Sequence, residues 1–172
     1  EALVNDCIKN SLKGRYSMKQ MKIGDWILEV DVERTKDFYQ AYHQITEGCD
    51  CLSCKNFVTA IKLIPKPVLD FFRSLGIDPT KEGEVSEYYE KKDGMHLYGG
   101  FFHIVGELIS GPDCWVETSV EVSHLATNNM IEINDFKFGF TYGVSSLPDE
   151  FPKPTVQLEF EGTIPWMLKE EP

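Results

Sequence analysis

The sequence lacks the features that identify a membrane-spanning or a secreted protein. No apolar run in the 172 residues reaches the roughly 18 residues that a membrane helix requires. The opening residues 1–14 carry acids and lysines where a signal peptide would have its apolar centre. The chain starts at Glu1 rather than Met, so this expectation applies to the given stretch alone. We therefore expect neither a membrane helix nor a secretory signal within these residues.

Positive charge is also scarce. The chain holds 17 Lys and Arg against 28 Asp and Glu, for a formal net charge of −11. Nucleic-acid backbones and anionic membrane surfaces both reward clustered cations, and the cations here are scattered. The sequence thus argues against both as main partners, and it favours an unidentified protein or small-molecule ligand. An acidic surface that engages a basic protein is a further hypothesis.

Known catalytic motifs are missing as well. The chain has no serine-nucleophile elbow, no Walker loop, no His-Glu-x-x-His and no dinucleotide-binding glycine pattern. Two acidic pairs, Asp31 with Glu33 and Glu159 with Glu161, alternate with apolar residues and are predicted to lie on solvent-exposed strand faces. The motifs therefore do not decide whether the protein is an enzyme.

Two helices are predicted from the periodic spacing of apolar residues. The first, 54–64, has Ser53 as its expected N-cap, an apolar stripe from Phe57 to Ile64, and Pro65 as its stop. The second, 67–75, begins at a proline and ends at Gly76, the residue type that favours a left-handed C-terminal cap. A short stripe over 1–13 predicts an additional N-terminal helix.

Most of the remaining chain has the pattern of strands. Alternation over 26–33 predicts a half-buried strand, with the aromatic run 38–42 as its hairpin partner. Further strands are predicted at 85–90, 95–110, 114–125, 130–142 and 155–166. Gly99, Gly100 and Gly106 predict a bulge or sharp bend in the longest of them.

These elements predict an α+β fold. We expect a curled or sandwiched antiparallel sheet with the two consecutive helices, 54–64 and 67–75, packed on one side. Residues 1–24 are assigned to the N-terminal helix and a linker, and 25–172 to a single domain.

The most unusual stretch is Cys49-x-Cys51-x-x-Cys54, which places three of the five cysteines within six residues. Three soft ligands at this spacing can surround one ion, and tetrahedral zinc needs a fourth ligand. His43 is the nearest candidate in the sequence, while other candidates depend on the fold: Cys7, Cys114, His96, His103 and His124. The odd cysteine count favours a reducing, cytoplasmic setting over a disulfide framework. The main hypothesis is a non-catalytic binding domain with a structural zinc.

Three alternatives stay open. The three cysteines can be free thiols that fill a tight turn. Cys51 and Cys54 form a Cys-x-x-Cys before a helix, and the helix dipole would lower the pKa of Cys54, although the antiparallel context is unlike thioredoxin. On the predicted strand 95–110, His103 with Glu107 suggests acid–base chemistry in a hydrolase.

Three segments together resemble a family of bacterial proteins of unknown function. They are the Cys-x-Cys-x-x-Cys-x-Asn-Phe segment 49–57, the Gly-Ile-Asp-Pro turn 76–79, and the Leu-Tyr-Gly-Gly-Phe-Phe-His segment 97–103. The resemblance covers about the middle third of the chain. It implies a small bacterial or phage-borne cytoplasmic protein, and it implies no activity, substrate or catalytic residue.

Overall fold

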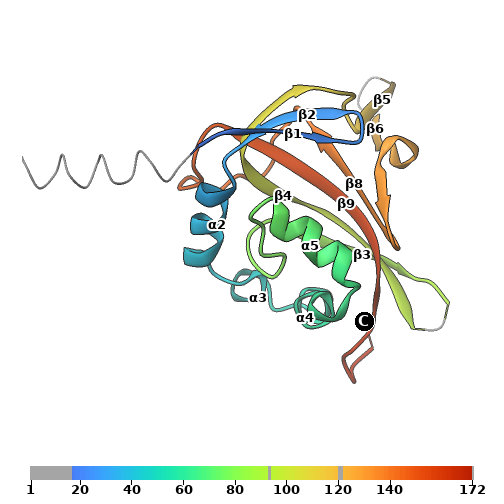
Figure 1. Cartoon of the computed structure of the whole chain (residues 1–172). Helices are drawn as coiled ribbons and strands as arrows, with labels where there is room; N and C mark the ends of the chain where they lie inside the picture. The colour runs from blue at the N-terminus through green and yellow to red at the C-terminus, as the bar shows by residue number, and fades with distance from the viewer. Residues whose placement is uncertain (1–16, 93, 120–121, 172) are drawn as a thin grey trace, which may run out of the picture.

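The computed structural model describes residues 17–92, 94–119 and 122–171 (Figure 1). The predicted N-terminal helix lies outside these residues. The described helices are α2 (Val32–Ala41), α3 (Ile45–Gly48), α4 (Leu52–Ala60) and α5 (Lys66–Ser74), with 3-10 turns η1 (Ile61–Leu63) and η2 (Thr127–Asn129). The strands are β1 (Lys19–Ile23), β2 (Trp26–Val30), β3 (Glu84–Glu90), β4 (Met95–Ser110), β5 (Trp115–Ser119), β6 (Val122–Leu125), β7 (Ile131–Ile133), β8 (Phe136–Thr141) and β9 (Thr155–Pro165). No helix among the described residues is long and apolar enough to cross a membrane.

The main sheet has the strand order β1-β2-β4-β9-β8-β7, and every pairing in it is antiparallel, as predicted. Strand β3 also pairs with β4. Strand β2 pairs with residues 106–110 of β4, and β3 pairs with residues 96–101. Since β9 occupies the opposite edge of β4, β2 and β3 share one edge and leave a gap between them at residues 102–105.

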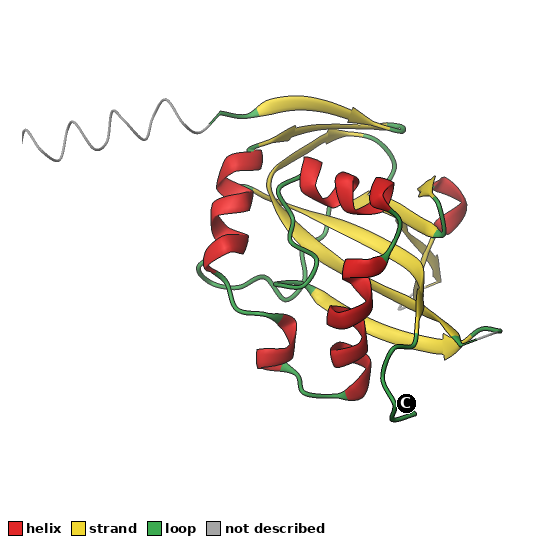
Figure 2. Ribbon diagram, turned by 60° about the horizontal axis from the view of Figure 1, so that its bottom comes forward, coloured by secondary structure: helices red, strands yellow, loops and turns green. Residues whose placement is uncertain are grey.

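The sheet curves around α4 and α5, which lie on its concave face (Figures 1 and 2). Phe72 of α5 contacts Phe102 of β4 with ring centroids 5.4 Å apart, and Phe57 of α4 lies 5.9 Å from Phe160 of β9. All four rings are fully buried. Burial of aromatic rings supplies most of the free energy that holds such a layer together. Helices α4 and α5 thus lie close to the two ranges predicted from apolar spacing, although α4 ends at Ala60 and continues as the 3-10 turn η1.

Helix α2 replaces a predicted strand. The aromatic run 38–42 was expected to pair with the strand before it, but Val32–Ala41 is helical. Asp31 begins the helix, because its carboxylate accepts the backbone N–H of Arg34 at 3.0 Å. Asp31 is buried, so its predicted place on a solvent-exposed strand face is also wrong.

Side chains of α2 fill the gap along the edge of β4. The hydroxyl of Thr35 accepts the backbone N–H of Val105 at 2.9 Å, and the hydroxyl of Tyr39 donates to the carbonyl of His103 at 3.0 Å. The backbone N–H of Asp31 donates to the carbonyl of Val105 at 2.8 Å. Buried backbone groups need partners, and here a helix supplies them where a strand would otherwise stand.

Gly99 and Gly100 of β4 allow close approach to β3, and no bulge of β4 lies at them. The register of β4 with β9 is continuous, the shift in the pairing with β3 lies on β3 between Glu87 and Tyr89, and the shift in the pairing with β2 skips Ile109 of β4. A Cβ atom on Gly99 would lie 2.4 Å from the Tyr88 hydroxyl, and one on Gly100 would lie 1.9 Å from the Glu84 carbonyl oxygen. A side chain at Gly100 would push the backbone of β3 away, and one at Gly99 would displace the ring of Tyr88.

Two further boundaries differ from the sequence prediction. Residues 19–23, assigned to a linker, form β1 and pair with β2. The predicted strand 114–125 is instead the separate two-stranded sheet of β5 and β6.

Candidate metal site at the cysteine loop

The three cysteines of the loop meet in space because two helix ends position them. Cys49 is the C-cap of α3, and its backbone N–H donates to Ile45 at 3.0 Å. Cys51 is the N-cap of α4, and Cys54 lies in the first turn of that helix. The three Sγ atoms lie within 4.8 Å of one another. The chain thus gathers three thiols at the junction between α3 and α4.

The N-cap of α4 is a thiol and not the predicted Ser53. The Sγ of Cys51 accepts the backbone N–H of Cys54 at 3.4 Å, and the Cys49 thiol donates to the Cys51 Sγ at 3.2 Å. The Tyr98 hydroxyl donates to the carbonyl of Ser53 at 3.1 Å, which ties the loop to β4. The sulfur positions therefore follow from the start of the helix and from its contact with the sheet.

Cys54 and Cys49 differ in burial, and their pKa values are shifted in opposite directions. Cys54 is 5% exposed, and burial raises its pKa well above the usual range for a thiol. Cys49 is exposed, and hydrogen bonding with the backbone N–H of Cys51 and with the thiols of Cys51 and Cys54 lowers its pKa. The predicted activation of Cys54 by the helix dipole is therefore wrong, because desolvation outweighs the dipole at this position.

His43 lies beside the cysteines without joining the group of mutually close ligand atoms. Its ring is exposed, stacks on Tyr42 with centroids 4.2 Å apart, and places Nδ1 3.1 Å from the Gln44 carbonyl oxygen. It nevertheless lines the same cavity as Cys49 and Cys54. This cavity of about 280 Å³, called here the thiol cavity, is lined by Tyr42, His43, Ile45, Gly48, Cys49, Cys54, Glu82, Gly83, Glu84, Val85, Ser146 and Pro148.

The other candidate ligands are placed elsewhere. Within the described ranges, the Cys49, Cys51 and Cys54 group is the one cluster of three or more metal-ligating side chains. Cys114 is fully buried beside β8, His96 pairs with Glu87 at 3.1 Å, and His124 is exposed on β6. Cys7 lies outside the described residues.

The carboxylate beside His103 is Glu82 and not the predicted Glu107. Glu82 Oε1 lies 2.5 Å from His103 Nδ1, while its Oε2 accepts the His103 backbone N–H at 3.1 Å and the Tyr39 hydroxyl at 2.7 Å. Both Glu82 and His103 are buried, whereas Glu107 is exposed on β4. Because every polar atom of Glu82 has a partner, this group stabilises the joint between α2, β3 and β4.

A second buried carboxylate continues this network on β9. His103 Nε2 lies 3.3 Å from Gln157 Oε1, and Gln157 Nε2 donates to Glu159 Oε1 at 2.5 Å. Burial raises the pKa of Glu159, which is 3% exposed. Its predicted solvent exposure is wrong because β9 lies inside the sheet, and the loop that carries Ser145 covers this face by donating its N–H to Gln157 Oε1 at 2.7 Å.

No family model, no curated protein and no solved structure matches this chain. The functional interpretation therefore rests on the geometry of the site.

Proposed function

We propose that the protein is a non-catalytic binding domain whose cysteine loop holds a structural zinc ion through Cys49, Cys51 and Cys54. The observation that carries this proposal is the mutual approach of the three Sγ atoms within 4.8 Å. Tetrahedral zinc with Zn–S bonds of about 2.3 Å separates its sulfur ligands by about 3.8 Å. The thiols therefore need to shift by little more than an ångström, which rotation about their side-chain bonds allows.

The chemistry of the ligand set supports zinc. Thiolate sulfur favours zinc and other soft ions over magnesium or calcium, which prefer oxygen ligands. All three thiols are free, as is Cys114, so no disulfide competes for them in this structure. The proposal includes a reducing, cytoplasmic setting, since oxidation of the loop would remove the ligands.

His43 is the fourth ligand in this proposal. It lines the thiol cavity with Cys49 and Cys54, and a Cβ atom at Gly48 would lie 3.8 Å from its Cε1. Its exposed ring is free to turn toward the sulfurs once it leaves the Gln44 carbonyl. A closed set of four protein ligands leaves no position for a reacting water, so the ion would join α3 to α4 and stabilise the fold.

Elemental analysis of protein purified without added metal or chelator tests this proposal. We expect about one zinc per chain, with the three loop thiols protected from alkylation until the protein unfolds. Cys51→Ser should lose the zinc and melt at a lower temperature, because a structural ion contributes its binding free energy to folding. Cys114→Ala is the control: it removes a thiol outside the cluster and should keep the zinc.

Two results would contradict the proposal. One is a metal-free protein with freely reactive loop thiols. The other is a Cys51→Ser variant that melts with the wild type. A reversible loss of two thiols on mild oxidation, without metal, would instead favour a thiol-dependent redox function, since the sulfurs of Cys49 and Cys51 lie 3.2 Å apart.

A further inference from the structure

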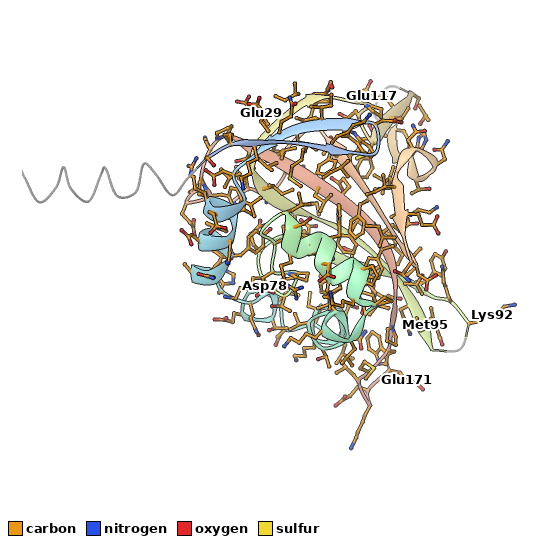
Figure 3. The ribbon with its side chains drawn as sticks, viewed as in Figure 1. Glu29, Asp78, Lys92, Met95, Glu117 and Glu171 are labelled. Carbon is orange, nitrogen blue, oxygen red and sulfur yellow. The ribbon has the colours of Figure 1, made fainter. Side chains whose placement is uncertain are left out.

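A second cavity lies next to the thiol cavity and has a different lining. It has a volume of about 650 Å³ and lies between α2, η1, α5 and the segment that follows α5. Asp78, which belongs to that segment, lies between α2 and α5 in Figure 3. We call it the basic cavity; its lining residues that carry the argument are Lys36, Lys62, Arg73, Lys81, Asp78 and Ile77.

The charge of this lining is opposite to that of the chain. Four cations, Lys36, Lys62, Arg73 and Lys81, line the cavity together with one acid, Asp78. The whole chain has a net charge of −11. The lining is thus locally positive in an acidic protein, which attracts anions by simple electrostatics.

The single acid is already engaged. Asp78 Oδ1 accepts the backbone N–H of Thr80 at 3.0 Å and the Thr80 hydroxyl at 2.7 Å. These bonds hold the carboxylate in a turn and satisfy part of its hydrogen-bonding capacity. Among the described residues, Asp78 also forms no ion pair with any of the four cations.

Most of the cationic charge is available. Within the part of the chain that the structure describes, Lys36 and Lys62 form no ion pair. Lys81 Nζ donates to the Gln40 carbonyl at 3.1 Å, which orients the ammonium group without neutralising it. Arg73 pairs with Asp70 at 2.6 Å, and Asp70 is shared with Lys66. Among residues 17–92, 94–119 and 122–171, three of the four cations thus have no carboxylate as an ion-pair partner.

The cavity also has an apolar side. The half-buried Leu69 lines it, together with the buried side chains of Tyr39, Ile61 and Ile77. The single O–H of Tyr39 is shared between Glu82 Oε2 and the His103 carbonyl, so the hydroxyl is bonded within the protein. A ligand that fits this lining has an apolar body and an anionic group.

One wall of the cavity is held in place by backbone hydrogen bonds. Gln44 forms an isolated antiparallel bridge with Lys81, and the Ile45 N–H donates to the Thr80 carbonyl at 3.0 Å. A preformed wall lowers the ordering cost of binding.

We propose that the basic cavity binds a small organic anion, a carboxylate or a phosphate monoester with an apolar body. The volume lies in the range of roughly 300 to 1,000 Å³ that is typical of small-molecule sites. The site is distinct from the cysteine cluster, and it does not depend on a metal there. The anionic group lies near Lys36 and Lys62, and the apolar body contacts the half-buried Leu69.

Binding of anilinonaphthalene sulfonate, an apolar organic anion that fluoresces when bound, tests this proposal on the intact protein. We expect the Lys36→Glu, Lys62→Glu double variant to bind at least about tenfold more weakly, because two attractive charges become repulsive. The matched control, Lys19→Glu with Lys55→Glu, changes the net charge equally at exposed positions outside the cavity and should bind within about twofold of the wild type. Melting curves should stay close to wild type for both pairs.

Competition defines the class of anion. Benzoate and phenyl phosphate should each displace the probe, and the tighter competitor assigns the site to carboxylates or to phosphate monoesters. The proposal is overturned if the wild type does not bind the probe, if both double variants change its affinity equally, or if uncharged anilinonaphthalene binds as tightly as the sulfonate.

Discussion

The two neighbouring cavities share one wall and differ in nearly every chemical respect. The thiol cavity holds two cysteines, a histidine and two glutamates, whereas the basic cavity holds four cations and one acid. The segment around Gln44 and its partner around Lys81 separate them. Gln44 and Lys81 line the basic cavity, while His43 and Glu82, the residues next to them, line the thiol cavity.

The contrast arises at the bridge between Gln44 and Lys81. These two residues line the basic cavity, whereas Glu82, the next residue, lies in a bend with a φ of 38° and lines the thiol cavity. The side with thiols and carboxylates suits a metal cation, and the side with ammonium and guanidinium groups suits an anion. The two proposals therefore concern ligands of opposite charge.

The largest expected effect comes from Glu82→Ala, which removes a buried carboxylate at the boundary between the two cavities. The change leaves two donors of His103 without their buried acceptor, and it leaves the Tyr39 hydroxyl with the His103 carbonyl alone. We expect the free energy of unfolding to fall by about 3 kcal/mol or more, measured by urea denaturation.

Two variants control this result. Glu84→Ala removes an exposed acid from the same cavity and should change stability by about 0.5 kcal/mol or less. Glu82→Gln keeps the volume and one acceptor and should fall between the wild type and Glu82→Ala. Equal stability of Glu82→Ala and Glu84→Ala would show that the buried network does not hold the wall.

A smaller effect is expected from a change of pH, and the effect on ligand affinity should differ between the two cavities. Burial raises the pKa of Cys54, so zinc must displace a proton from this thiol when it binds. As the pH falls from 8 to 7, zinc affinity should drop by about tenfold for each proton displaced. Calorimetry in two buffers of different ionisation enthalpy measures the released protons.

The basic cavity supplies the comparison for this measurement. Its described lining contains no thiol and no histidine. Probe affinity there should therefore change little over the same pH interval. A zinc affinity that is independent of pH would count against thiolate ligation.

The smallest effect is expected from Asp70→Asn, which tests how charge affects anion binding in the basic cavity. Asp70 is the ion-pair partner of Arg73, and Lys66 and Arg73 hold the pKa of this carboxyl below its usual range. Removing the carboxylate charge should raise the affinity of the basic cavity for the anionic probe by about twofold. Fluorescence titration at low and high salt measures the gain, and an effect that is the same at both would argue against a charge-based cause.

The local parts of the fold could be predicted from the sequence. Helices α4 and α5 follow from apolar spacing and their proline and glycine boundaries, and β4 occupies the predicted range 95–110. Helix α2 could not be predicted in the same way, because its aromatic run is typical of a strand and its N-cap, Asp31, continues the alternation of β2. The decision between the two depends on the gap in the edge of β4, which is a property of the assembled sheet.

The candidate sites also differ in whether they could be predicted from local sequence. The cysteine cluster spans six residues, so its spacing alone indicated that the thiols can meet. The hydrogen bond between Glu82 and His103 joins a bend before β3 to the middle of β4, and Glu82 has a φ of 38° in a polar turn that no sequence motif marks. The cations of the basic cavity come from separate segments, so only the fold brings them together.

The insertion of α2 into the edge of β4 has a consequence for local unfolding. The amide hydrogens of His103 and Val105, at the centre of the longest strand, are bonded to the side chains of Glu82 and Thr35 and not to a neighbouring strand. Thr35 belongs to α2, and Glu82 accepts the hydroxyl of Tyr39, also of α2, at 2.7 Å. The docking of α2 therefore controls the exchange of the Val105 amide with deuterated solvent directly, and that of the His103 amide through Glu82. The helix and the middle of the sheet should open together as one cooperative unit, although one is near the surface and the other is in the core.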